Sequence, residues 1–221
     1  MPHMKIFVIS DIHGEIKHLD SAAGMLGSAD LVVVCGDFTG TRGGSAAADI
    51  LSGIESYNSA VLAVHGNWDS NDVADLLKTK GCFLHAGGRI IDGVGFFGVG
   101  GSGKTPFKTP CEYSETEIED FLHAGYREVP AAETTVLVSH CPPRKVRDRT
   151  YLGLRGGSVA VRKFIETNKI DLCLTGHIHE AFGVERLGGC TVVNSGTFKK
   201  GNYSYIEIGS SITVEQGKLR Y

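Results

Sequence analysis

Five apolar segments of this chain each lead, through a glycine or a serine, to a residue that can bind a metal ion. The segments span residues 5–9, 31–35, 60–64, 135–138 and 171–174, and the residues reached are Asp11, Asp37, Asn67, His140 and His177. In open α/β sheets, ligands gather outside the carboxyl ends of the strands. The repeated pattern therefore predicts an α/β fold in which loops from separate strands build one site.

The segments between these strands have apolar residues at helical spacing. We expect helices over residues 15–26, 45–56, 71–80, 114–124 and 158–168. Three successive strand–helix units at the start of the chain predict parallel pairing with helices on the outer face. The middle of the chain has short β-like pieces at hairpin spacing over residues 82–84, 89–92 and 95–99.

The last forty residues alternate β-like runs with turns and contain no predicted helix. These runs span residues 182–186, 191–194, 203–208 and 211–215. The chain has no internal repeat and no linker, so we expect one α/β domain over residues 1–221 with two sheets.

Charge and cysteine content exclude several classes of protein. The net charge of −3 argues against a generic nucleic-acid or membrane-surface binder. The six cysteines are far apart, and the chain shows neither a secretion signal nor the roughly 20 consecutive apolar residues of a membrane helix. We therefore expect reduced thiols in a cytoplasmic protein that has no membrane partner and forms no stable nucleic-acid complex. The sequence leaves a homo-oligomer open.

The residues at the strand ends form a ligand set too large for one tetrahedral zinc ion. They comprise two carboxylates, one amide and four imidazoles: Asp11, His13, Asp37, Asn67, His140, His177 and His179. Such a set suits two metal ions with open positions, and its mixed donors favour Mn, Fe, Zn or Ni over Ca or Mg. Two cations roughly 4 Å apart can clamp the attacking and leaving oxygens of a phosphoryl displacement. The set therefore indicates phosphate-ester hydrolysis.

The same residues make the chain resemble the calcineurin-like metallophosphoesterase family from residue 5 to about residue 205. The family pattern Asp-x-His, Gly-Asp, Gly-Asn-His-Asp/Glu, His and Gly-His-x-His is met, in order, at Asp11/His13, Gly36/Asp37, Gly66/Asn67/Asp69, His140 and Gly176/His177/His179. The resemblance implies a four-layer α-β-β-α sandwich with two mixed β-sheets. It also implies two divalent metal ions; we expect manganese, with iron, zinc or nickel as alternatives.

The resemblance assigns a role to each of these residues. One metal would be held by Asp11, His13, Asp37 and His179, and the other by Asp37, Asn67, His140 and His177, so that Asp37 bridges the two. A metal-bridging hydroxide would attack phosphorus directly, with Asp37, Asn67 and His140 as the catalytic residues. The expected substrate is a small phosphorylated molecule or a nucleotide.

One position departs from the family pattern. Trp68 follows the Gly-Asn pair where the family usually has a histidine that is thought to protonate the leaving oxygen or to steady the transition state. Indole has an N–H donor but no usable acidity. Diesters and nucleotides, whose leaving groups need little protonation, are therefore favoured over alkyl monoesters. His65 is a possible substitute, although a structural role at a strand end is the preferred interpretation.

Two other functions stay open at this stage. Residues 98–105 match the P-loop consensus, but Pro110 would disrupt the helix that a P-loop must open, and the preceding hairpin pattern does not fit a parallel β-α unit. A metal-binding scaffold with the same fold is the other alternative, and the complete ligand set argues against it.

Several other residues have predicted structural or accessory roles. Asp69 is expected to cap the third helix, and Cys141 to serve packing. Residues 144–155 form a basic segment that could guide an anionic substrate or could be a solvated loop. Asn194 opens a turn that resembles the Asn-Pro-Gly-Ser turn of the family, and it is expected to orient a histidine or to form the turn.

Overall fold

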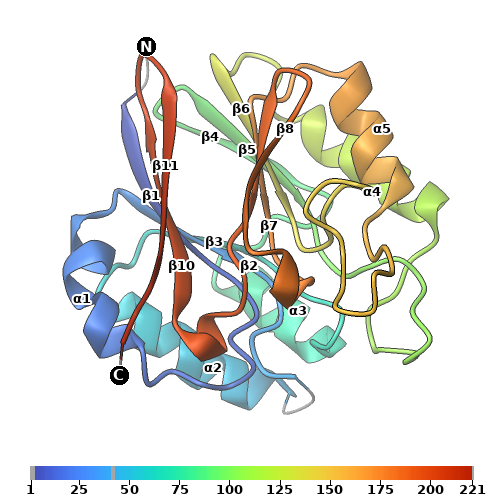
Figure 1. Cartoon of the computed structure of the whole chain (residues 1–221). Coiled ribbons are helices and arrows are strands. Elements are labelled where there is room, and N and C mark those ends of the chain that lie inside the picture. The colour runs from blue at the N-terminus through green and yellow to red at the C-terminus, as the bar shows by residue number, and fades with distance from the viewer. Residues whose placement is uncertain (1–2, 41–42, 221) are drawn as a thin grey trace.

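The structure is a computed structural model that describes residues 3–40 and 43–220. Of the expected domain 1–221, residues 1–2, 41–42 and 221 lie outside the described residues. The described chain forms two β-sheets and five α-helices (Figure 1).

The first sheet has five strands and is built from the two ends of the chain. Its order is β11 (Ile212–Lys218), β10 (Asn202–Ile208), β1 (Met4–Ile9), β2 (Leu31–Cys35) and β3 (Val61–Val64). The first three strands in the chain pair in parallel, as the strand–helix pattern predicts, whereas β10 pairs antiparallel with β1.

The second sheet has six strands and is also mixed. Its order is β4 (Gly88–Ile91), β5 (Val94–Val99), β6 (Thr134–Ser139), β7 (Leu172–Thr175), β9 (Cys190–Asn194) and β8 (Gly183–Leu187). The outer pairs β4–β5 and β8–β9 are antiparallel, and the pairs between β5, β6, β7 and β9 are parallel.

Successive side chains of a strand point to opposite faces of its sheet, so each sheet packs on both faces and four layers result. In β1, Ile6 and Val8 pack against the second sheet, whereas Phe7 and Ile9 pack against helices. The helices on that side are α1 (Leu19–Ser28), α2 (Gly43–Glu55) and α3 (Asn71–Thr79). Helices α4 (Glu115–Tyr126) and α5 (Val159–Thr167) cover the outer face of the second sheet (Figure 1). The predicted four-layer sandwich with two mixed sheets is thus confirmed.

Two segments differ from the expected elements. Helix α1 begins at Leu19, and Ile16, expected on its apolar face, is 43% exposed in the turns that precede it. Residues 82–84 form only an isolated bridge between Phe83 and Ala63. The late helix start has a local cause. Gly14 has a φ of 79°, and the N–H of Glu15 bonds to the carbonyl of Ile12, so the chain turns before it coils.

The cysteines are buried and the helices are short. All six cysteines are buried and none forms a disulfide. The α-helices in the described ranges have 9 to 13 residues, well below the length needed to span the hydrocarbon core of a bilayer.

Candidate metal centre

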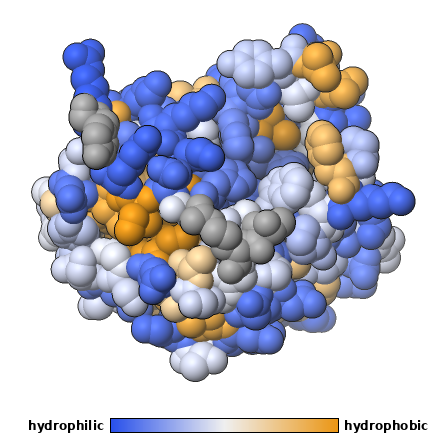
Figure 2. Space-filling view, turned by 90° about the horizontal axis from the view of Figure 1, so that it is seen from below, coloured by the Kyte–Doolittle hydropathy of each residue, from blue (hydrophilic) through white to orange (hydrophobic). Residues whose placement is uncertain are grey.

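The loops after β1, β2, β3, β6 and β7 meet at one end of the molecule, where the carboxyl ends of the parallel strands of both sheets lie close together. Viewed from below, the molecule is hollowed between two raised edges, and mainly hydrophilic residues cover the hollow (Figure 2). The predicted site residues lie at the ends of these strands. Their contacts fall into two groups that share Asp11.

The first group joins Asp11, His13 and His179, whose ligand atoms all lie within 4.8 Å of one another. Nε2 of His179 lies 3.1 Å from Oδ1 of Asp11, and Nε2 of His13 lies 3.9 Å from the same oxygen. The two Nε2 atoms of His13 and His179 face each other at 3.4 Å. Imidazole nitrogens that converge on one carboxylate oxygen are arranged as ligands of a common ion would be.

The second group joins Asp11, Asp37 and His140, all of them buried. Oδ2 of Asp37 lies 3.5 Å from Nε2 of His140 and 3.8 Å from Nε2 of His13. One oxygen of Asp37 therefore faces a histidine of each group. Nδ1 of His140 lies 2.6 Å from the carbonyl oxygen of Cys35, so an N–H donated there leaves the lone pair of Nε2 directed at the cluster.

His177 joins the cluster in a different way. Its backbone N–H donates to Oδ2 of Asp11 at 2.9 Å, and its ring centroid lies 5.1 Å from that of His140. Among the described residues, its imidazole nitrogens form no hydrogen bond or ion pair. These nitrogens, next to His140, are therefore available for a ligand.

Four of the seven predicted site residues have left-handed backbone conformations. The φ angles are 54° for Asp11, 48° for His13, 55° for Asp37 and 65° for His177. Non-glycine residues rarely adopt positive φ, and such residues concentrate at functional sites. The backbone strain indicates that the surrounding packing holds these side chains in place.

Three glycines allow this crowding because a side chain at their positions would fill the site. A Cβ on Gly66 would overlap Oδ1 and the backbone nitrogen of Asp37, and one on Gly176 would overlap Oγ of Ser10. A Cβ on Gly36 would lie 2.6 Å from Nδ1 of His140. The glycines of the sequence motifs thus let backbone and ligand side chains approach closely.

Burial and mutual charge shape the electrostatics of the cluster. Burial and the neighbouring charges of Asp11 and Asp69 raise the pKa of Asp37. Burial also acts to raise the pKa of Asp11, but its hydrogen bond with His179 and the charges of His140 and His179 together outweigh burial and lower that pKa. Burial lowers the pKa of His13 to about 4 and that of His177 to about 3. Neutral imidazoles beside two close carboxylates provide lone pairs and negative charge, which fit divalent cations.

A chain of hydrogen bonds determines which way the Asn67 amide points. Nδ2 of Asn67 donates to Oγ1 of Thr109 at 3.0 Å, and that hydroxyl donates to Oε1 of Glu112 at 2.8 Å. Burial acts to raise the pKa of Glu112, but hydrogen bonds from Thr105 and Thr109 outweigh it and lower this pKa to about 2. Because the ionised carboxylate of Glu112 can only accept, the Thr109 hydroxyl donates to it and accepts from the Asn67 amide N–H. Oδ1 of Asn67 therefore faces Nε2 of His140, 3.0 Å away. Neither Thr109 nor Glu112 carries a sequence signal for this role.

Asp69 does not cap the third helix, and that prediction was wrong. Its carboxylate is fully buried and accepts backbone N–H groups from Gly66 at 2.8 Å and from Phe38 and Thr39 at 3.1 Å. The N-cap position of α3 belongs to Ser70. Because Asp69 ties the loop after β2 to the loop after β3, it holds Asp37 and Asn67 in register. The tertiary contact between the two loops outweighs the local preference for a cap.

Asn194 organises the loop that carries the last two histidines. Its Nδ2 lies 3.1 Å from the carbonyl oxygen of Gly176 and 3.0 Å from that of Ile178, on either side of His177. Its Oδ1 accepts the N–H of Gly196 at 2.8 Å. Asn194 thus both forms the turn and fixes the backbone around His177.

Trp68 and His65 occupy different surroundings. The backbone N–H of Trp68 donates to Oδ1 of Asp37 at 2.9 Å, and its side chain is 36% exposed. His65 is buried among aromatic rings, and its Nε2 lies 3.1 Å from the hydroxyl of Tyr113. His65 therefore points into a packed cluster and does not substitute for the missing histidine.

The glycine-rich segment at residues 98–105 does not open a helix. After β5 the chain forms a loop, in which the ammonium of Lys104 donates to the carbonyl of Glu112 at 3.1 Å, and α4 begins only at Glu115. The arrangement lacks the helix N-terminus that a P-loop presents to phosphates. The thiol of Cys141 is buried and lies 3.2 Å from the carbonyl of Gly156, in agreement with a packing role.

Two stacked mixed sheets between helices, with carboxylates and imidazoles gathered at the strand ends, define the class of metallophosphoesterases. The family model described as the calcineurin-like phosphoesterase superfamily domain matches residues 4–208. The chain therefore belongs to the calcineurin-like phosphoesterase superfamily, and this membership supports a metal-dependent phosphoesterase.

Two curated proteins illustrate the relationship. The chain is 36% identical over 197 residues to the uncharacterized protein MJ1162 of Methanocaldococcus jannaschii, and the match covers 87% of this chain and 88% of that protein. It is 26% identical over 222 residues to the UPF0046 protein K07C11.7 of Caenorhabditis elegans, and that match covers 91% of this chain and 72% of that protein.

Solved structures share the fold at low sequence identity. Protein TT1561 of Thermus thermophilus superposes with a TM-score of 0.76 at 22% identity, over 98% of this chain and 99% of that one. A dimetal phosphatase from Danio rerio superposes with a TM-score of 0.62 at 11% identity, over 99% and 97% of the two chains. These likenesses establish the architecture alone.

Proposed function

We propose that this protein is a dinuclear metal-dependent phosphodiesterase that acts on phosphodiesters or nucleotides. The observation that carries the proposal is the position of Asp37, whose Oδ2 faces His13 on one side and His140 on the other. A carboxylate oxygen placed between two sets of imidazoles is suited to bridge two cations.

The proposal gives each of the seven residues a role, following the family resemblance. Asp11, His13, Asp37 and His179 would hold one cation, and Asp37, Asn67, His140 and His177 would hold the other. Bound divalent cations, with manganese our expectation, would activate the attacking water and neutralise charge on the phosphate. Asp37, Asn67 and His140 would orient the reacting centre, because their own hydrogen bonds fix where their ligand atoms point.

The side chain at position 68 favours diesters. Trp68 has no acidic proton to give to a departing alkoxide, and its backbone is tied to Asp37 beside the proposed centre. The imidazoles and carboxylates around it are already committed as ligands or positioning groups. Substrates whose leaving groups depart without protonation are therefore the ones that this site is suited to cleave.

A substrate and metal comparison tests the proposal. We expect purified protein supplied with Mn to bind two ions per chain and to hydrolyse bis(p-nitrophenyl) phosphate faster than β-glycerophosphate. Ni, Zn and Mg serve as parallel conditions. In the same assay, Trp68→His should raise kcat on β-glycerophosphate by about tenfold or more, since a general acid contributes roughly 10²–10⁴. Trp68→Phe, which lacks both indole N–H and acid, is the matched control.

The outcomes separate the candidate functions. Bound metal without turnover on diesters, monoesters or nucleotides would favour a scaffold over an enzyme. Absence of bound metal together with absence of turnover would contradict the proposal. A lack of gain on monoesters in Trp68→His would refute the leaving-group argument while leaving the metal centre in place.

The hydrogen-bond chain behind Asn67 gives a second expected result. Thr109→Val keeps the shape of the side chain but removes the hydroxyl that accepts from Asn67. Loss of a group that orients a metal ligand typically costs about 10–100-fold in metal affinity or activity. We expect the affinity for the second metal ion to fall within this range while the first stays bound, as measured by metal titration. Thr109→Ser retains the hydroxyl and should restore binding; equal weakening by both variants would contradict the orienting role.

A further inference from the structure

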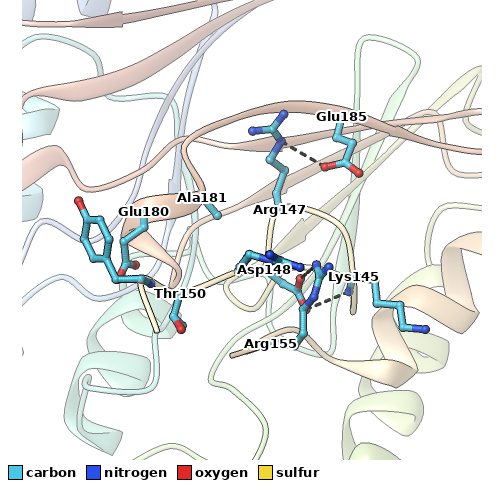
Figure 3. A pocket seen from close by; sticks show the side chains of 10 residues that line it. Lys145, Arg147, Asp148, Thr150, Arg155, Glu180, Ala181 and Glu185 are labelled. Carbon is cyan, nitrogen blue, oxygen red and sulfur yellow. Dashed lines mark hydrogen bonds and ion pairs between the residues drawn. The ribbon is translucent and has the colours of Figure 1, made fainter. Parts of the chain in front are cut away.

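A cavity of about 550 Å³ lies between the basic segment, the short helix η1 (His179–Ala181) and β8 (Figure 3). Its cationic lining residues are Lys145, Arg147, Arg149 and Arg155. Residues 144–155 carry five lysines and arginines against one aspartate, within a chain of net charge −3. Positive charge is therefore concentrated at this cavity.

The acidic residues that line the cavity are already committed to partners. Asp148 is fully buried, and its carboxylate accepts from the guanidinium of Arg155 at 2.6 Å and from backbone N–H groups of Lys145 and Gly157. Glu185 pairs with Nε of Arg147 at 3.4 Å (Figure 3). The carboxylate of Glu180 accepts the backbone N–H of Tyr151 at 3.4 Å. These bonds hold the loop in shape, and two of the three carboxylates are paired with arginines.

The cations of the cavity differ in how free they are. Arg147 is held by the carbonyl oxygens of Phe182 and Val184, so it acts mainly as a structural clamp. The side chains of Lys145 and Arg149 form no ion pair with any residue in the described ranges. Arg149 is therefore a guanidinium available for an anion, and guanidinium binds phosphate oxygens in a bidentate manner.

The cavity adjoins the candidate metal centre. Two of its lining residues, Glu180 and Ala181, directly follow His179, whose side chain is 38% exposed at the edge of the cluster. Nδ2 of Asn194 lies within 3.3 Å of the carbonyl oxygens of Arg147, Gly176 and Ile178. The same amide therefore fixes the basic loop against the loop that carries His177 and His179.

We propose that this cavity is a second anion subsite that binds a phosphate group of the substrate other than the one being cleaved. The inference rests on the proposed phosphodiesterase function and specifies its substrate class: phosphodiesters or nucleotides that carry an additional phosphate. Arg149 would contact this phosphate, and Arg155 would contribute its N–H groups that are not bonded to Asp148. Asp148 holds the segment in place through the backbone N–H groups of Lys145 and Gly157.

The test uses two substrates that differ only in the extra phosphate. Wild-type protein with Mn is assayed on thymidine 5′-(p-nitrophenyl phosphate) and on the same compound phosphorylated at the 3′ oxygen. We expect kcat/KM to be about tenfold higher for the 3′-phosphorylated compound, the gain from roughly one charge-assisted contact. Arg149→Ala should bring this ratio close to one, and Arg149→Lys should leave it in between. Arg127→Ala, an exposed arginine at the end of α4, is the matched control and should keep the wild-type ratio.

The outcomes distinguish a failed subsite from a failed enzyme. A wild-type ratio of one on hydrolysed substrates would overturn the subsite and leave the enzyme intact, and so would a ratio that Arg149→Ala does not change. If neither diester is hydrolysed, the proposed function fails. The subsite is then decided by calorimetric binding of thymidine 3′,5′-bisphosphate and thymidine 5′-monophosphate. A tighter bisphosphate complex that Arg149→Ala weakens supports the subsite, and equal affinities overturn it.

Discussion

The Asp37→Asn variant is expected to lose bound metal and phosphodiesterase activity together while keeping its fold. Asparagine preserves the shape of the side chain and can still accept the N–H of Trp68 through one oxygen. It replaces the oxygen that faces both His13 and His140 with an NH₂ group and removes the negative charge. We expect kcat/KM on bis(p-nitrophenyl) phosphate to fall by about 10³-fold or more, the upper range for loss of one preorganised electrostatic group.

The stability of the metal-free protein separates this effect from unfolding. Burial, Asp11 and Asp69 raise the pKa of Asp37, so its ionised form destabilises the fold as pH rises above the ordinary value of about 4. A neutral amide removes this penalty, and Asp37→Asn should be at least as stable as metal-free wild type at pH 7. Wild type should gain stability when Mn is added, because metal binds only the folded state, and the variant should gain less.

Asp75→Asn provides the matched control for this variant. Asp75 is exposed on α3, where it pairs with Lys78 on the surface, and such pairs contribute little. The metal content and turnover of the Asp75→Asn variant should equal those of wild type. Full activity in Asp37→Asn would defeat the dinuclear scheme.

The second large effect is expected from Gly66→Ala, a change of one methyl group. A Cβ at this position would overlap both the side chain and the backbone nitrogen of Asp37. The backbone cannot yield easily, since Asp69 accepts N–H groups from Gly66 and from the two residues after Asp37. We expect the free energy of unfolding to fall by about 2–3 kcal/mol, as for other overpacked sites. Metal content should fall as well, because Asp37 is displaced.

Gly24→Ala is the matched control for the added methyl group. Gly24 lies within α1, and a Cβ there would meet no atom within 4 Å. Alanine in a helix interior is favoured over glycine by about 1 kcal/mol, so this variant should be slightly more stable than wild type. Chemical denaturation and metal analysis of both variants check the pair. Wild-type metal content and stability in Gly66→Ala would show that the loop accommodates a side chain.

The periodicity of the sequence predicts most of the fold. Residues 31–35 have the pattern of a buried strand and form β2, and residues 71–80 have the pattern of a helix and form α3 over Asn71–Thr79. These patterns are local, because side-chain direction alternates along a strand and returns every 3.6 residues along a helix. The errors fall where local geometry is not periodic: at Ile16, in the turns that follow His13, and at Phe83, which forms only an isolated bridge.

That the candidate site residues would gather at one place was predictable from the sequence, but their geometry was not. Motifs at the strand ends named Asp11, Asp37, Asn67 and His140, because parallel strands deliver their carboxyl ends to one edge. The contact between His13 and His179 joins residues 166 positions apart. How those imidazoles meet depends on the stacking of the two sheets, which no local pattern encodes.

The sequence by itself determined that strands alternate with helices, that five of the strands are apolar, and that ligand-type residues follow these strands. Tertiary structure alone decided that Asp69 joins two loops, that Glu112 and Thr109 orient Asn67, and that Gly66 must lack a side chain against Asp37. The physical reason is the range of the interactions. Periodicity follows from the geometry of neighbouring residues, whereas the hydrogen bonds and close contacts of the site join loops that meet only after the sheets have packed.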